Sequence, residues 1–216
     1  MVVSYRISEP SAVFFLLNNI ALAVIKITGR GFLVRGAVTI GQLYHTEKYV
    51  VGPALNEAYR LDSRVAKSPR ILIDPDVLEV ARRFRSDIHT ASEEAAYVEP
   101  FLTVDDDGLF FFDYISFDDV TAVCGGEEQL FPNYLKMIGE MVERGLTHSD
   151  AQVQNKYLWL HQKYVATRSS IAELEADNVI RVEFPDVYEK IVALPDYREQ
   201  ATAAMEAVAR FEATKL

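Results

Sequence analysis

The sequence of 216 residues predicts an α+β fold, an α/β sandwich in which a sheet is flanked by helices and followed by a helical C-terminal extension. Three observations predict it. In the first half, apolar and β-branched runs alternate with segments of helical periodicity. A turn at residues 105–108, Asp-Asp-Asp-Gly, separates two further apolar runs, as in a β-hairpin. Beyond Leu130 the apolar spacing is helical. We therefore expect a domain of residues 1–125, with a helical extension of residues 126–216 packed on it.

The first elements expected are a strand, a helix and a second strand. Val2–Ser8 is expected to be the first, short strand. The helix should begin at Ser8, a good N-cap, because an acid and a proline follow in the first turn. It should end near Thr28, where the glycines of Gly-Arg-Gly can cap it. With a strand at Leu33–Gln42, these elements predict a βαβ unit with a right-handed crossover.

The middle of the chain is expected to alternate between strands and helices. A polar stretch at Ser86–Glu99 predicts a loop. The other elements expected before the helical extension are a return strand at Tyr49–Val51, a helix at Pro53–Asp62, a strand at Ser68–Ile73, a helix from Asp74 to about Phe84, and a hairpin of Phe101–Val104 with Leu109–Ile115. The extension should contain helices at Pro132–Arg144, Ser149–Ala166, Phe184–Leu194 and Tyr197–Lys215.

Composition limits the partners of the chain. With 22 Lys and Arg against 32 Asp and Glu, the net charge is −10, which disfavours binding to long nucleic acid. An acidic chain can still bind a single nucleotide if a divalent cation screens the phosphates. The one cysteine excludes an intrachain disulfide. No signal peptide is visible, and the apolar stretch 13–27 is too short and mixed to span a bilayer, so we expect a cytoplasmic protein without membrane contact.

One helix face carries a pair of residues suited to a nucleotide. Asn56 and Arg60 lie four residues apart, so they share one face of the helix that Gly52-Pro53 opens. The amide of Asn56 both donates and accepts hydrogen bonds, and the guanidinium of Arg60 is a fixed cation with a planar fork of donors. Together they could hold a ribose and a phosphate.

These residues carry a resemblance to a known family. The stretch Gly52–Asp62, GPALNEAYRLD, resembles the Gly-Asp-x-x-Asn-x-x-x-Arg-Leu-Glu pattern of the class III nucleotide cyclases. It is still more similar to the bacterial pyrimidine cyclases of anti-phage signalling, which carry RGGxxIGELYH and GPALxEAYxLE. The first of these patterns matches Arg35–His45, RGAVTIGQLYH. The similarity extends to Asp107–Tyr114 and Lys156–Leu160.

The resemblance implies a fold, a reaction and an assembly. The fold would be a ferredoxin-like cyclase sheet covered by helices. The reaction would convert UTP or CTP into cUMP or cCMP and pyrophosphate, a second messenger of anti-phage defence. Asn56 would orient the ribose and Arg60 would stabilise the pentavalent phosphate. In this family Mn²⁺ or Mg²⁺ is held by two Asp residues, and the active site forms between two subunits, which implies a homodimer.

The sequence departs from the family at the metal site. It contains no Phe-x-Asp-Ile-x-Gly-Phe segment, and Val2–Ser8 matches only the end of the second metal pattern, with Val3 where the Asp should be. We therefore expect the first strand of the family, its helix and both metal carboxylates to be missing, so that no metal ligand is assigned. Two explanations stay open, a truncated or misassigned start and a divergent, metal-free relative.

The sequence also departs from the family at the position that reads the base. Pro53 replaces the Asp that reads adenine in adenylyl cyclases, and proline offers no side-chain hydrogen bond. Tyr5 or Arg35 could instead read a smaller base, and the alternative for each is a strand residue in a packed or paired environment. The alternative function is a catalytically inactive cyclase-like protein that acts as a dimerisation or nucleotide-binding module.

Overall fold

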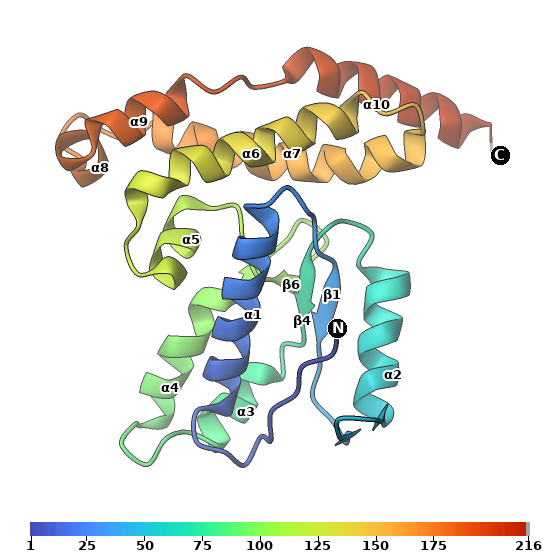
Figure 1. Cartoon of the computed structure of the whole chain (residues 1–216), viewed down its shortest axis with the longest axis vertical. Helices are drawn as coiled ribbons and strands as arrows, with labels where there is room; N and C mark the ends of the chain where they lie inside the picture. The colour runs from blue at the N-terminus through green and yellow to red at the C-terminus, as the bar shows by residue number, and fades with distance from the viewer. Residues whose placement is uncertain (215–216) are drawn as a thin grey trace. The chain divides into compact units, whose positions relative to one another are not determined.

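A computed structural model describes residues 1–214 of the chain (Figure 1). By its internal contacts the chain divides into two compact units. The first contains Met1–Ile25 and Leu33–Tyr114, and the second contains Lys26–Phe32 and the chain from Ile115 onward. The division expected after residue 125, between a domain and a helical extension, stays a prediction.

The first unit is built on a small mixed sheet of four strands, in the order β1-β4-β6-β5. β1 (Gly36–Val38) runs parallel to β4 (Ile71–Ile73), with Ala37 opposite Leu72. The other two strands, β5 (Thr103–Val104) and β6 (Phe110–Phe111), form the predicted hairpin and pair antiparallel. The fold is therefore mixed α and β, as predicted, and its ferredoxin-like form stays a prediction.

Helices flank this sheet. Figure 1 shows α2 (Pro53–Arg60) on one side of β1 and β4, and α1 (Ala12–Thr28), α3 (Val77–Arg83) and α4 (Ala91–Val98) on the other. The ring of Phe14 on α1 lies 5.9 Å from that of Tyr97 on α4 and 6.1 Å from that of Phe101. Phe101 in turn contacts Phe112, which follows β6. This aromatic cluster joins α1 and α4 to the end of the hairpin.

The predicted strand at Val2–Ser8 is wrong. The segment is irregular, and Val2, Val3 and Ile7 are each 43% exposed. An apolar extended segment becomes a strand only when its backbone N–H and C=O groups pair with a neighbour, and the four-stranded sheet ends at β1. The parallel unit is formed instead by β1 and β4, with α2 in the connection between them.

The predicted loop at Ser86–Glu99 is also wrong, because most of it is α4. The helix begins with a capping box. The hydroxyl of Thr90 accepts from the backbone N–H of Glu93 (3.2 Å), and the Glu93 carboxylate accepts from the backbone N–H of Thr90 (2.7 Å). Only Ala95 and Val98 supply buried apolar side chains, so the apolar stripe of this polar helix is narrow.

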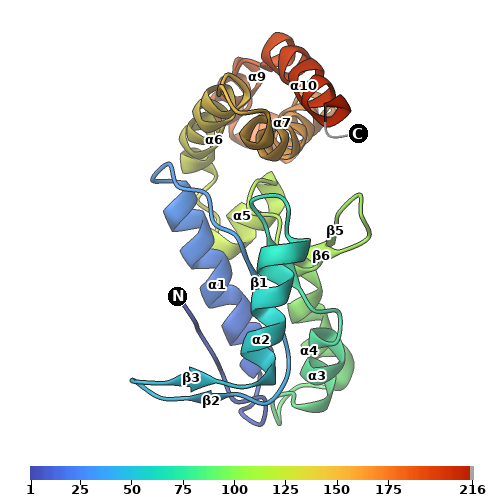
Figure 2. The same cartoon turned by 90° about the vertical axis from the view of Figure 1, so that its right-hand side faces the viewer.

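A second, two-stranded sheet projects from the first unit. Its strands are β2 (Tyr44–His45) and β3 (Val50–Val51), and Figure 2 shows this hairpin extending away from the foot of α2. The hairpin returns to α2 through Gly52, whose φ is +152°. A Cβ at Gly52 would lie 2.5 Å from the carbonyl oxygen of Gln42, so only glycine allows this close approach.

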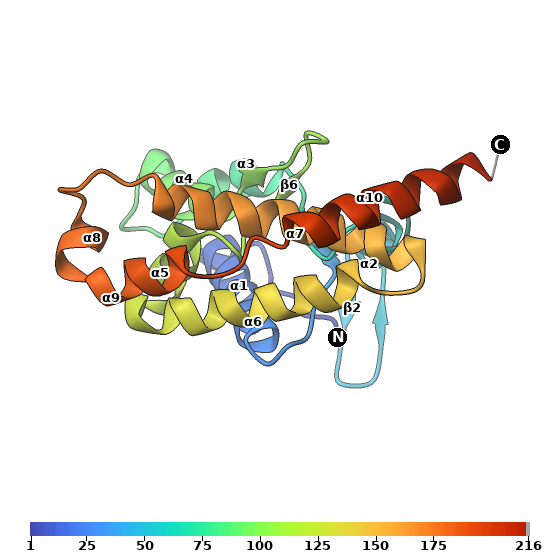
Figure 3. The same cartoon turned by 90° about the horizontal axis from the view of Figure 1, so that it is seen from above.

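The second unit is helical, as predicted for the C-terminal extension. Figure 2 shows its long helices nearly end-on, and Figure 3 shows them lengthwise. Its helices are α5 (Phe117–Cys124), the short η3 (Glu128–Leu130), α6 (Phe131–Leu146), α7 (Ala151–Ala172), α8 (Val179–Glu183), α9 (Pro185–Val192) and α10 (Arg198–Ala213). The helix expected at Tyr197–Lys215 is α10, and Lys215 lies outside the described residues. No helix within residues 1–214 has the length and apolar character needed to cross a membrane.

Side chains of α7 anchor the connection between α9 and α10. The hydroxyl of Tyr164 donates to the carbonyl of Pro195 (2.8 Å), and Arg168 donates to the carbonyls of Val192 and Leu194 (2.7 Å each). These donors satisfy the carbonyl of the last residue of α9, Val192, and two carbonyls of the connection that follows it. Burial raises the pKa of Tyr164 well above its ordinary value.

Candidate functional site

The candidate site lies on α2 and the turn that continues it. α2 begins at Pro53, a residue that tolerates the first helical turn because it lacks an N–H. After Arg60 the helix continues as a π-helical turn, η1 (Leu61–Val65), which closes with a 2.8 Å bond from the N–H of Ala66 to the carbonyl of Leu61. Ala54 faces the unit and is buried. This segment therefore presents one polar face to the outside.

Asn56 and Arg60 both lie on that exposed face. The guanidinium of Arg60 donates to both oxygens of the Glu57 carboxylate, over 2.7 and 2.6 Å. These hydrogen bonds raise the pKa of Arg60 and lower the pKa of Glu57. Both side chains are about half exposed, so the pair is weak in water and open to exchange with another anion.

Of the other predicted residues, Arg35 and Pro53 lie close to this face. The Nε of Arg35 donates to Oδ1 of Asp62, in η1, over 2.9 Å. Pro53 is the exposed first residue of α2. The structure thus joins Arg35, before β1, to the turn after Arg60.

Tyr5 lies elsewhere. Its hydroxyl accepts from the amide of Asn19 on α1 over 2.7 Å, and the neighbouring Ser4 contacts Nδ1 of His45 on the hairpin over 2.7 Å. These contacts tie the N-terminal segment to α1 and β2. A base-reading role for Tyr5 stays a prediction.

The residues described do not fit a metal centre. Within residues 1–214, no group of three or more His, Cys, Asp or Glu side chains could hold a metal ion. Val3 is in the irregular N-terminal segment. Mn²⁺ or Mg²⁺ stays a prediction, and no step of a reaction can be assigned here to a metal.

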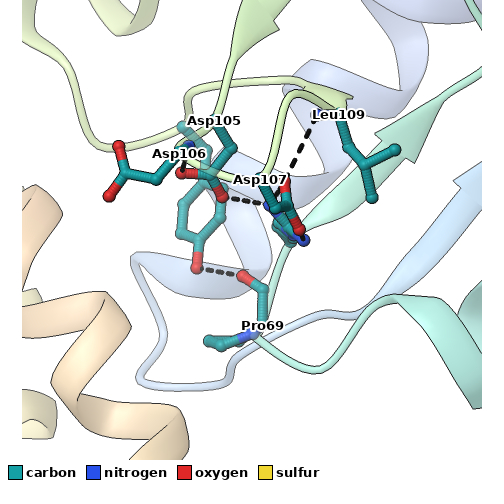
Figure 4. Close-up of polar contacts among 7 residues, drawn as sticks. Pro69, Asp105, Asp106, Asp107 and Leu109 are labelled. Carbon is teal, nitrogen blue, oxygen red and sulfur yellow. Dashed lines mark hydrogen bonds and ion pairs between the residues drawn. The ribbon is translucent and has the colours of Figure 1, made fainter.

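The acidic turn at residues 105–107 instead binds an arginine that the sequence analysis missed. The carboxylates of Asp105 and Asp107 both accept from the guanidinium of Arg70, the residue before β4, and Figure 4 shows these two acidic residues on the turn. Arg70 and Asp105 are buried, and Nη1 of Arg70 also donates to Asp107 over 3.1 Å. The hydrogen bond from Arg70 lowers the pKa of Asp107. This network holds the β5–β6 turn against β4, and one guanidinium is shared by two carboxylates.

A second missed cluster surrounds Glu94, which is 1% exposed. Its Oε2 accepts from the hydroxyl of Ser11 (3.0 Å) and the backbone N–H of Ser86 (3.3 Å), and it lies 2.8 Å from Nδ1 of His89. Burial raises the pKa of Glu94, but these hydrogen bonds more than offset it and lower the pKa. The capping-box pattern of Thr90 and Glu93 was the signal in the sequence that could have revealed α4, the helix that carries Glu94. Its role is to fix the start of α1, where Ser11 has a φ of +55°.

Two hollows have none of the predicted site residues in their lining. One of about 540 Å³ and one of about 390 Å³ belong to the second unit and share Glu143. The larger is lined by Arg30, Gly31, Phe32, Met137, Glu140, Glu143 and Arg144. None of these residues carries the resemblance described above.

No family model matches the chain, and comparisons with the curated proteins and with the solved structures find no significant match. The case for a function therefore depends on the residues of the α2 face and on the motifs around them.

Proposed function

We propose that the chain is a class III-type nucleotide cyclase that acts on UTP or CTP and makes a cyclic pyrimidine nucleotide for bacterial anti-phage defence. The observation that carries the proposal is the exposed pair Asn56 and Arg60, one turn apart on α2, directly after Gly52-Pro53. The matching motif at Arg35–His45 supports it.

The two residues have separate tasks in this reaction. The 3′-oxygen of the ribose attacks the α-phosphorus, the bond to the β-phosphate oxygen breaks, and pyrophosphate leaves with the electron pair. The proton of the 3′-hydroxyl is released in the step. Catalysis of such a transfer consists mainly of positioning and charge stabilisation. Asn56 positions the ribose, and Arg60 exchanges Glu57 for the α-phosphate, where negative charge builds up.

A second candidate function is a cyclase-like module that binds a nucleotide or dimerises without catalysis. The observation that favours it is the lack of a metal-binding cluster among residues 1–214. The site of either candidate would form between two copies of the chain, as a twofold homodimer.

One experiment separates the candidates. The chain is incubated with each of the four nucleoside triphosphates and Mn²⁺, and cyclic nucleotide and pyrophosphate are measured by chromatography. Binding is measured in parallel by calorimetry. Cyclic product from UTP or CTP supports the cyclase, binding without product supports the module, and neither binding nor product contradicts both.

Variants of Arg60 test its role. In a form that makes product, Arg60→Ala should lower turnover about 10²–10³-fold, and far more than it lowers binding, because the guanidinium acts on the transition state. Arg60→Lys should restore little, since a point charge cannot reproduce the planar fork. Near-normal turnover of Arg60→Ala would contradict the catalytic assignment.

A further inference from the structure

We propose that Arg64 is a second phosphate-binding residue of this site and contacts the β- and γ-phosphates of the nucleotide. The inference rests on the proposed function and extends it to a residue outside the Asn–Arg motif. It follows from the π-helical turn after α2, from the charges around that turn and from the spacing of three residues.

The spacing places Arg64 in line with the motif. Asn56, Arg60 and Arg64 follow one another at intervals of four residues, and all three are exposed. In a regular α-helix, residues four apart are offset by about 40° around the axis. The π-helical turn η1 has more residues per turn, so four residues along it complete less than one full turn. The angular offset between Arg60 and Arg64 therefore has the opposite sign to that between Asn56 and Arg60. Arg64 is thereby kept on the same face as Asn56.

The charges around the turn leave Arg64 uncommitted. The segment and its neighbours bring together three cations, Arg35, Arg60 and Arg64, and two acids. Glu57 is paired with Arg60, and Asp62 is paired with Arg35. Among residues 1–214 no ion pair or hydrogen bond is found for the guanidinium of Arg64. Both acids of the segment are therefore already paired with another cation.

The order of the residues matches the order of groups in the ligand. Four residues of α-helix rise about 6 Å, so Arg60 lies about 6 Å beyond Asn56 along the face, and Arg64 lies one further, π-helical turn beyond Arg60. If Asn56 holds the ribose and Arg60 the α-phosphate, the next position along the face meets the β- and γ-phosphates. A guanidinium suits them because its fork binds phosphate oxygens in pairs. π-helical turns are rare and are frequent at functional sites.

The test compares triphosphate and monophosphate binding. Calorimetry with UTP, CTP, UMP and CMP is carried out on the full chain, on Arg64→Ala and Arg64→Lys, and on Arg60→Ala. Lys48→Ala is the matched control, because Lys48 is an exposed cation on the β2–β3 hairpin and its loss changes the net charge equally. Circular dichroism checks that each variant is folded.

Arg64→Ala should weaken UTP or CTP binding at least 10-fold, the effect of one charge-assisted contact, and change monophosphate binding less than 2-fold. Arg64→Lys should recover part of the loss. Equal weakening of tri- and monophosphates, or no more weakening than in Lys48→Ala, would overturn the role of Arg64. If the unaltered chain binds UTP or CTP and converts it to cyclic product, and Arg64→Ala binds the triphosphate as well as the unaltered chain does, the proposed function stands and this inference fails. If the unaltered chain binds no triphosphate, both fail.

Discussion

The guanidinium of Arg60 is held by the carboxylate of Glu57, three residues earlier on α2, through hydrogen bonds of 2.7 and 2.6 Å. An anion that binds Arg60 must displace Glu57. Because the two side chains are about half exposed, water screens the pair and the exchange is easy. The pair therefore keeps Arg60 extended on its helix without blocking it.

The first prediction concerns this competition. Glu57→Gln removes the competing charge, so triphosphate affinity should rise, by less than about tenfold because an exposed pair is weak. Calorimetric titration with UTP and CTP measures the change. Glu47→Gln, an exposed acid on the hairpin, is the control for net charge. A lower affinity in Glu57→Gln than in this control would show that Glu57 positions Arg60 instead of competing for it.

The second prediction concerns assembly. If the site forms between two copies of the chain, a twofold homodimer should be present at tens of micromolar, roughly the range of weak dimers. Multi-angle light scattering measures the mass against 24.4 kDa for one chain. A monomer at all concentrations tested, with and without UTP or CTP, would contradict the shared site.

The third prediction concerns the buried network of Arg70. Arg70→Met removes the cation that forms an ion pair with the buried Asp105 carboxylate. The free energy of unfolding should fall by about 3–5 kcal/mol, as when one partner of a buried ion pair is lost. Urea denaturation followed by circular dichroism measures it. Asp107→Asn is the milder comparison, since the Asp107 side chain is 48% exposed, and an equal loss in the two variants would refute the special role of burial.

The fourth prediction concerns acid stability. Folding lowers the pKa of Glu94 below its ordinary value of 4.5, so ionised Glu94 stabilises the folded state above that pH. This contribution should be lost as the pH falls below about 4.5. Ser11→Ala removes one donor and raises the pKa of folded Glu94 toward that of the unfolded chain, so the loss of stability should be smaller and should be complete at a higher pH. Urea denaturation between pH 3 and 7 measures both, and identical pH profiles for the two proteins would rule this account out.

The fifth prediction concerns the contact between α6 and α7. A Cβ at Gly145 would lie 1.9 Å from the ring of Tyr157, at the ring atom nearest the backbone. Gly145→Ala should therefore lower the free energy of unfolding by about 1–3 kcal/mol, as overpacking does. In the background of Tyr157→Ala the same substitution should stabilise by up to about 1 kcal/mol, because alanine favours a helix over glycine. The same sign in both backgrounds would disprove the clash.

Elements with strong local signals could be predicted from the sequence. The start of α2 follows from Gly52-Pro53, and α6, α7, α9 and α10 follow from their apolar spacing. α4 was missed because its apolar stripe is narrow, although the pattern from Thr90 to Glu93 was present. Val2–Ser8 has the composition of a strand, but no strand within residues 1–214 pairs with it. Local composition does not reveal whether a partner is present.

By itself the sequence determined the mixed fold, the helical C-terminal part and the shared face of Asn56 and Arg60, since each depends on spacings of four residues or fewer. Only the tertiary structure decided the pairs of Arg35 with Asp62, Arg70 with Asp105 and Ser11 with Glu94, which lie 27, 35 and 83 residues apart. Such pairs form because the tertiary fold brings distant parts of the chain together. The spacing of residues within one segment does not specify which distant parts will meet.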